Sequence, residues 1–196
     1  FSRVILATHY LGEQFQSFVS LHQGLLPSLE LVREPHPLGT GGALRHAISV
    51  VRTNSFVALN GDSWFEQPLA PVISHHRERK AALTMVVVRA DGVEGGARQK
   101  GVVSMGREGE IARFATQEMT SGGWINAGCY VIEKILTQGW PTGRYDLEHE
   151  FMSLVPHGTG MAFQSTFPLL DIGTPEMYRR AEEQFAAAAV SQEGRG

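Results

Sequence analysis

The sequence contains a single cysteine, Cys129, and no long hydrophobic run. One cysteine cannot form a disulfide within the chain, which excludes a disulfide-stabilised scaffold and favours a reducing compartment, so we expect the cytoplasm. No stretch approaches the roughly 18 consecutive apolar residues of a membrane span. The N-terminal segment differs from a signal peptide because Arg3, His9 and Glu13 interrupt it. We therefore expect no membrane partner.

An excess of positive charge is also missing. The 17 Lys and Arg residues are outnumbered by 20 Asp and Glu residues, which gives a net charge of −3. A chain that binds DNA or RNA needs a basic stripe that neutralises phosphates, so we expect no nucleic-acid partner. By contrast, 42% of the 196 residues are hydrophobic and only 19% are charged, which is enough apolar material for one folded core and excludes a disordered chain.

Several catalytic motifs are absent or incomplete. The chain has no phosphate-binding G-K-S or G-K-T triplet and no G-x-S-x-G sequence around a serine. A dinucleotide fingerprint would need a glycine at Leu44, and an H-E-x-x-H zinc motif would need a histidine at Ser153. The adjacent His75 and His76 are better explained as surface residues than as zinc ligands. Cys129 lies among apolar residues, which favours a packing role over a nucleophile.

Apolar runs alternate with helical patterns, and this alternation is typical of β-α-β units with a mainly parallel sheet. The fold class is therefore α/β. We expect strands at about 3–8, 29–34, 55–60 and 82–89. Between them we expect helices at about 11–22, 40–52 and 69–80.

Beyond residue 90 the pattern indicates a hairpin, a strand, a short helix, an extended segment and a terminal helix. Their expected ranges are 100–105 with 110–115, 124–132, 147–155, 161–172, and onward from Thr174. Thr174 is expected to cap the last helix, with Pro175 at its first position. One domain is expected over 1–190, followed by a disordered tail at 191–196.

A glycine-rich segment runs from Glu34 to Leu44, between an expected strand and an expected helix. Residues such as Gly39, Thr40 and Gly41 let a planar or phosphorylated group approach main-chain amides, and a helix N-terminus supplies unpaired N–H donors. The same residues also suit an ordinary tight turn from strand to helix. The segment alone does not decide between a ligand-binding loop and that turn.

Two aspartates, Asp62 and Asp171, each follow an apolar strand. Sites in parallel α/β sheets lie just beyond the carboxyl ends of strands. One or two carboxylates, completed by phosphate oxygens, form the usual protein site for Mg²⁺, and a divalent cation with phosphates indicates phosphoryl or nucleotidyl transfer. Asn60-Gly61-Asp62 is equally good turn or cap chemistry, so the cation site and the turn both remain open.

Six sequence segments, taken in order, resemble the sugar-1-phosphate nucleotidyltransferases. They read E-P-x-P-L-G-T-G-G-A-L, N-G-D-S, G-V-V with I-x-x-F, W-I-N-A-G-x-Y, D-L-E-x-E-F and D-I-G-T-P-E-x-Y, and they cover about residues 3–182. Among these enzymes the chain looks most similar to guanylyltransferases that act on heptose or mannose 1-phosphate. The resemblance implies a Rossmann-like, three-layer fold and a reaction that joins a sugar 1-phosphate to GTP, giving a GDP-sugar and pyrophosphate for cell-surface polysaccharide precursors.

The resemblance also assigns residues. It implies that Asp62 and Asp171 are catalytic Mg²⁺ ligands and that Gly39 contacts the base through its main chain. Glu34 stands where relatives often carry a base-reading glutamine. A carboxylate accepts without donating, and guanine offers two adjacent donors where uracil and thymine offer one, so Glu34 favours GTP. The residues in segments that resemble the sugar pocket are Gly101, Asn126 and Glu148.

Two features depart from the family. A lysine that contacts the sugar phosphate is expected shortly after Phe114, but Thr116 and Gln117 stand there, and sliding the alignment to Glu118-Met119 supplies none. The family's opening G-G-x-G-T-R-L loop and its P-K are also missing, so we expect an N-terminally truncated chain that lacks the first β-α unit and is nearly inactive alone.

Two alternatives remain open at this level. A non-catalytic regulatory subunit that binds a sugar nucleotide would keep the fold without the chemistry. A thymidylyl-, uridylyl- or cytidylyltransferase of the same family would differ in the base. The sequence also leaves open which sugar 1-phosphate is used and whether the chain forms a homo-oligomer.

Overall fold

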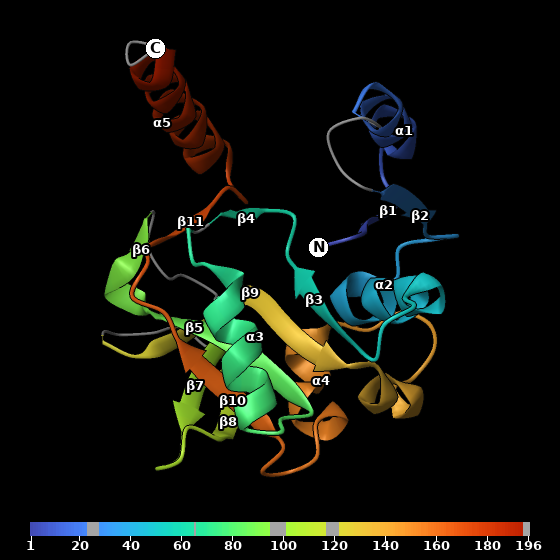
Figure 1. Ribbon diagram of the computed structural model, residues 1–196, viewed down its shortest axis with the longest axis vertical. Coiled ribbons are helices and arrows are strands. Elements are labelled where there is room, and N and C mark those ends of the chain that lie inside the picture. Colours follow the sequence, from blue (N-terminus) through green and yellow to red (C-terminus); the bar gives the residue numbers. More distant parts are fainter. Residues whose placement is uncertain (23–27, 65, 95–100, 117–121, 194–196) are drawn as a thin grey trace. The chain divides into compact units, whose positions relative to one another are not determined.

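A computed structural model describes residues 1–22, 28–64, 66–94, 101–116 and 122–193 (Figure 1). The chain divides into two compact units, and the boundaries between them cut two strands, Ser55–Leu59 and Trp124–Glu133. The first unit comprises Phe1–Phe56 with Glu133–Leu154, and the second comprises Val57–Ile132 with Val155–Gly196. Both units mix helices with strands, as the predicted α/β class requires.

The first unit is built around one β-α-β element. Strands β1 and β2 pair in parallel through helix α1, as the alternating sequence pattern predicts. Both strands are largely half-buried rather than fully buried, because they form a two-stranded sheet in the described part of the chain. The elements of this unit are β1 Val4–Thr8, α1 Gly12–Leu21, β2 Leu29–Arg33, α2 Gly39–Ala47, η1 Ile48–Val50, η3 Lys134–Gly139 and α4 Leu147–Leu154.

The second unit contains a six-stranded sheet and a three-stranded sheet. The larger sheet has the order β10-β5-β9-β7-β8, with β3 also paired to β9, and the smaller has the order β4-β11-β6. The strands are β3 Ser55–Leu59, β4 Ser63–Trp64, β5 Leu83–Arg89, β6 Val93–Glu94, β7 Gly101–Met105, β8 Ile111–Thr116, β9 Trp124–Glu133, β10 Gly160–Gln164 and β11 Leu169–Asp171. The helices are α3 Leu69–Glu78, η2 Ala90–Gly92 and α5 Pro175–Glu193.

The larger sheet is mixed rather than mainly parallel. Strand β10 runs parallel to β5, but β9 is antiparallel to both β5 and β7, and β7 is antiparallel to β8. The antiparallel part consists of the predicted hairpin, β7 with β8, and of strand β9, which pairs with β7 on its other side. The α/β class is confirmed, and the direction of β9 is the detail that the sequence pattern missed.

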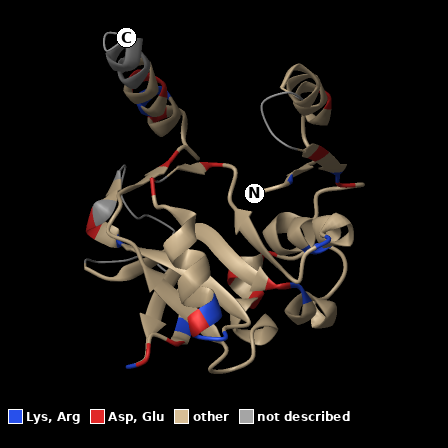
Figure 2. Ribbon diagram, viewed as in Figure 1, with Lys and Arg blue, Asp and Glu red and all other residues tan. Residues whose placement is uncertain are grey.

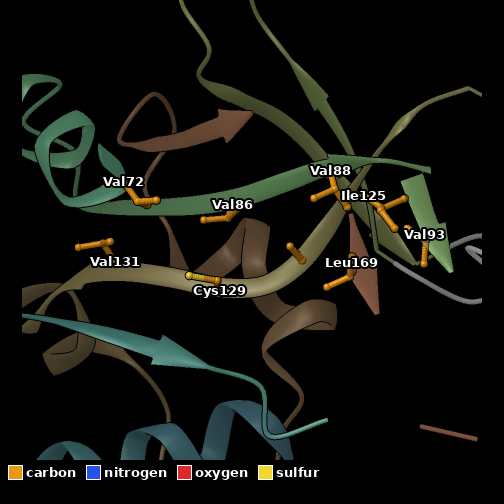
Figure 3. Close-up of a cluster of buried hydrophobic side chains, with 9 residues drawn as sticks. Val72, Val86, Val88, Val93, Ile125, Cys129, Val131 and Leu169 are labelled. Atoms are coloured by element: carbon orange, nitrogen blue, oxygen red, sulfur yellow. The ribbon is translucent and has the colours of Figure 1, made fainter. Parts of the chain in front are cut away.

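Valine-rich β5 forms the centre of the core of the second unit. Leu83 to Val88 are all buried, and α3 covers one face of β5 through Val72. Figure 3 shows a cluster of buried side chains around β5. It includes Val72 of α3, Val86 and Val88 of β5, Cys129 and Val131 of β9, and Leu169 of β11. The continuous apolar run of β5 therefore has the burial on both faces that such runs predict.

Three sequence predictions need correction or refinement. The helix expected over 40–52 ends at Ala47 and continues as the short helix η1. The single extended segment expected over 161–172 is two strands in different sheets, β10 and β11. His76 is not a surface residue: it is 2% exposed and shares a 2.9 Å hydrogen bond between its Nδ1 and the Thr84 hydroxyl.

The start of the last helix is as predicted. The Thr174 hydroxyl accepts a hydrogen bond from the Met177 amide at 3.2 Å, which is the N-cap geometry expected of a threonine before Pro175. Helix α5 continues to Glu193, and residues 194–196 lie outside the described residues. No helix in the described ranges has the length and apolar character to cross a membrane.

Candidate functional site

In the second unit, the structure brings Asp62 and Asp171 together. Asp62 follows β3 and directly precedes β4, while Asp171 ends β11. Strands β4 and β11 are antiparallel neighbours (Figure 1), and Asp171 pairs with Ser63, the residue after Asp62. The amide of Ile172 donates a 2.9 Å hydrogen bond to the carbonyl oxygen of Asp62. Two carboxylates that are far apart in the sequence thus lie at the same end of the β4–β11 pair.

Gly173 lies close to both carboxylates. A Cβ atom built on Gly173 would stand 2.9 Å from Asp171 Oδ1 and 3.9 Å from Asp62 Oδ2. Both carboxylates therefore reach the space that this glycine leaves open. The Gly173 amide also donates a 2.7 Å hydrogen bond to Asp171 Oδ1, which fixes the orientation of that carboxylate. Gly173 is not among the site residues predicted from the sequence, although a glycine two residues after a strand-end aspartate is a recognisable turn signal.

The donor set is suited to a hard cation that keeps other ligands. The described residues contain no group of three or more His, Cys, Asp or Glu side chains placed for a metal. Mg²⁺ does not need such a group, because one or two carboxylates with phosphate oxygens and water complete its shell. Asp62 is exposed and Asp171 half-buried, so both are open to a phosphate ligand. The residues present fit Mg²⁺.

Asn126 and Gly101 have structural partners in the second unit. Asn126 is 7% exposed; its Oδ1 accepts from the Gly128 amide at 2.9 Å, and its Nδ2 donates to the Tyr130 hydroxyl. Gly101 lies under an aromatic ring, since a Cβ there would stand 2.3 Å from Cζ of Phe114. Contact of either residue with a sugar remains a prediction. The expected lysine position cannot be placed, since Gln117 and residues 118–119 lie outside the described residues.

In the first unit, Glu34 follows β2 and contacts the turn that leads into α2. Its Oε2 accepts a 3.0 Å hydrogen bond from the Leu38 amide, and its backbone amide donates to the Thr8 carbonyl at 2.8 Å. The carboxylate is thus fixed by the chain at one oxygen. A carboxylate oxygen has a second lone pair, so Glu34 can accept further hydrogen bonds in this position.

The glycines at the start of α2 are needed for close packing against residues 143–147. A Cβ on Gly41 would stand 2.2 Å from Cε2 of Tyr145, and one on Gly39, whose φ is +72°, would stand 2.6 Å from the Tyr145 carbonyl oxygen. The amides of Gly41 and Gly42 both donate to that carbonyl oxygen, at 3.1 and 3.2 Å. These helix N-terminal amides are therefore not the unpaired donors that the sequence suggested.

Thr40 connects the glycine-rich turn to Glu148 of α4. The Thr40 hydroxyl donates to Glu148 Oε2 at 2.6 Å and accepts from the Leu147 amide at 2.9 Å. The Thr40 amide in turn lies 3.4 Å from Asp146 Oδ1. Two predicted site residues from separate parts of the sequence are thereby joined, and the orientation of the Glu148 carboxylate depends on Thr40.

Thr40→Val is expected to destabilise the chain by about 1–3 kcal/mol, because it removes a hydroxyl with two partners and leaves the Leu147 amide without its acceptor. Thr40→Ser keeps the hydroxyl and is the matched control. Urea denaturation of both variants measures the difference. Equal stabilities of the valine and serine variants would show that the hydroxyl bonds contribute nothing.

Cys129 has the environment of a packing residue. It is fully buried, and burial raises the pKa of its thiol to about 12. The thiolate, which is the reactive form, is therefore not populated near neutral pH. In the first unit, burial likewise raises the pKa of Tyr145 to about 12, with the Arg45 charge opposing the shift.

Cys129 is expected to resist thiol reagents in the folded chain and to react fully after denaturation. Because its pKa is raised from 9.0 to about 12, its contribution to stability is constant below pH 9 and is lost as the pH rises toward 12. Labelling with a disulfide reagent at pH 8, with and without urea, measures the accessibility. Rapid labelling of the native chain would contradict the packing role.

The sequence is similar to a known protein family and to individual enzymes. A family model described as "Nucleotidyl transferase" matches residues 2–187. The mannose-1-phosphate guanylyltransferase of Mycobacterium tuberculosis is 32% identical over 182 residues, which are 90% of this chain and 50% of that protein. The D-glycero-alpha-D-manno-heptose 1-phosphate guanylyltransferase of Aneurinibacillus thermoaerophilus is 30% identical over 189 residues, 93% of this chain and 77% of that protein. The chain thus spans about half the length of the first relative.

A solved structure supports the fold. HddC from Yersinia pseudotuberculosis, crystallised as a complex with GMP-PN, superposes with a TM-score of 0.80 at 24% identity, over 94% of this chain and 79% of that one. This likeness confirms the predicted nucleotidyltransferase fold. The family model covers nearly the whole sequence, and one relative at 30% identity is matched over most of its length. The chain therefore belongs to the nucleotidyl transferase family.

Proposed function

We propose that this chain is the nucleotidyltransferase domain of a sugar-1-phosphate guanylyltransferase, which joins heptose or mannose 1-phosphate to GTP and releases pyrophosphate. The observation that carries the proposal is the pair of carboxylates, Asp62 before β4 and Asp171 at the end of the neighbouring β11, which both lie within 4 Å of the Cβ position of Gly173. The names of the two curated relatives support the choice of GTP and of these sugars.

In this proposal Asp62 and Asp171 hold Mg²⁺. When bound, the cation would neutralise negative charge on the triphosphate oxygens and so make the α-phosphorus easier to attack. The Asp171 carboxylate is oriented by the Gly173 amide, and the backbone of Asp62 is held by the Ile172 amide. Ligands that the fold already holds in place do not have to reorganise during the reaction.

Glu34 is proposed to recognise guanine. Its carboxylate is held in place by the Leu38 amide and keeps accepting capacity for the base. The guanine edge presents N1–H and the exocyclic amine side by side, and a carboxylate accepts from both. Uracil and thymine present one donor next to an acceptor, which a carboxylate repels. Glu34 is therefore the residue on which selectivity for GTP depends.

The chemistry asked of the protein is mainly positioning. A phosphate oxygen of the sugar 1-phosphate attacks the α-phosphorus of GTP in line with the leaving pyrophosphate, so one P–O bond forms as another breaks. No side chain needs to form a covalent intermediate. This agrees with the burial of Cys129, which removes the one thiol of the sequence from the surface. Glu148, held by Thr40, is proposed to bind sugar hydroxyls.

The proposal is tested by pyrophosphate release with Mg²⁺, using the protein as its gene encodes it. GTP, ATP, UTP, CTP and dTTP are each paired with mannose 1-phosphate and with a heptose 1-phosphate. We expect release that prefers GTP. Release with another triphosphate would assign a different member of the family, whereas tight binding of a GDP-sugar without any release would assign a regulatory, non-catalytic role.

A further inference from the structure

Strand β9 has an irregularity in the middle of the larger sheet. Opposite β5, Met85 pairs with Tyr130 and Val87 pairs with Asn126, so Val86 alone faces residues 127–129. Gly128 lies in this bulge with a φ of +71°, a conformation that side-chain-bearing residues rarely adopt. Bulges bend a strand locally and often occur beside functional sites.

The side chain of Asn126 holds the bulge in place. Its Oδ1 accepts from the Gly128 amide at 2.9 Å, and its Nδ2 donates to the Tyr130 hydroxyl. The carboxamide therefore connects one residue inside the bulge with one beyond it. Because Asn126 is only 7% exposed, these two bonds are protected from water and fix the local backbone.

The bulge is in direct contact with the segment that carries Asp62. The amide of Asn60 donates to the Gly128 carbonyl oxygen at 2.8 Å. A Cβ on Gly128 would stand 2.7 Å from Cγ of Asn60, closer than non-bonded carbons approach. Asn60 precedes Asp62 by two residues, and Asp62 is held on its other side by Ile172. Asn126 and Gly128 therefore form a series of contacts that reaches Asn60, which the chain joins to Asp62 through Gly61.

We propose that Asn126 and Gly128 are positioning residues that set the place of the Asp62 carboxylate. This rests on the proposed role of Asp62 as a cation ligand. It gives Asn126 a task different from the sugar contact that the family resemblance implies, because both polar ends of its side chain are engaged within the chain. Gly128 is required by the bulge, since any larger residue would push Asn60 and move Asp62.

The test is the affinity of the full chain for Mn²⁺ alone, read from paramagnetic broadening of the amide NMR signals of Gly61 and Gly173. Gly128→Ala is expected to weaken Mn²⁺ binding about tenfold, the effect typical of losing support behind a metal ligand. Gly158→Ala is the matched control. Gly158 has a similar φ of +77°, but a Cβ there meets no atom within 4 Å. Backbone strain is common to both variants, whereas the contact with Asn60 is made only at Gly128.

Asp62→Ala separates the inference from the proposed function. If it binds Mn²⁺ as the unmodified chain does, the proposed metal site is wrong and the inference fails with it. If Asp62→Ala abolishes binding while folded Gly128→Ala binds normally, the inference alone is overturned. Should Gly128→Ala not fold, Tyr130→Phe removes one partner of Asn126. We expect this variant to weaken Mn²⁺ binding less than Gly128→Ala does, because one of the two bonds of Asn126 remains, and unchanged binding would equally overturn the inference.

Discussion

Asp62→Asn and Asp171→Asn are each expected to lower kcat/KM for pyrophosphate release by on the order of a thousandfold. Asparagine keeps the size and one oxygen of aspartate but removes the charge that holds the cation. A bound cation contributes several kcal/mol of charge stabilisation, and each ~1.4 kcal/mol is a factor of ten in rate. Steady-state kinetics at several Mg²⁺ concentrations measures the loss, and higher Mg²⁺ should restore part of it.

The control for this prediction is Asp91→Asn. Asp91 is an exposed aspartate of η2 in the same unit. It forms an ion pair with Arg89, in which Asp91 Oδ1 lies 3.5 Å from Arg89 Nε. An exposed ion pair contributes little to stability, so this variant should behave as the unmodified protein does. If Asp62→Asn or Asp171→Asn retained more than about a tenth of the activity, its carboxylate would not be an essential cation ligand.

Glu34→Gln is expected to reduce kcat/KM for GTP about 10–100-fold and to improve the relative use of UTP and dTTP. The amide offers one acceptor and one donor, which opposes the two donors of guanine but complements the donor and acceptor of uracil. A hydrogen bond to a charged group contributes about 1.5–3 kcal/mol, which gives the expected size. Competition assays with mixed triphosphates measure the change in selectivity.

The structure supplies an internal control for Glu34. Glutamine can still accept from the Leu38 amide through its oxygen, so Glu34→Gln should melt close to the unmodified protein. Glu34→Ala loses this bond and should be less stable by about 1 kcal/mol. Unchanged GTP preference in a stable Glu34→Gln protein would assign base recognition to other residues and leave Glu34 only as a support of the turn before α2.

Local patterns in the sequence predict much of the fold. The Val-rich run of β5, the alternation that gives β1-α1-β2, the β7-β8 hairpin and the Thr174 cap all depend on residues close together in the chain. The positions of Asp62 and Asp171 at strand ends follow from the same reasoning. Their placement side by side required the pairing of β4 with β11, and both strands are too short for a periodic pattern to reveal.

Other features depend on contacts distant in the sequence and could not be predicted from it. From the sequence, the amides of Gly41 and Gly42 are expected to be unpaired donors. In the folded chain both donate to the carbonyl oxygen of Tyr145, which is distant in the sequence. His76 has the sequence context of a surface residue, yet Thr84 on β5 provides a buried partner. The distribution of charge does not indicate the position of the site either, because Lys and Arg are scattered over many elements of the described residues (Figure 2).

The proposed function requires that Asp62 and Asp171 bind one shared cation. Crystals of the protein soaked with Mn²⁺ and GTP test this most directly, through anomalous scattering from manganese. We expect an anomalous peak within about 2.0–2.3 Å of a carboxylate oxygen of each aspartate, the range for small divalent cations. A manganese peak bonded elsewhere, with both carboxylates free of metal, would contradict the proposed site.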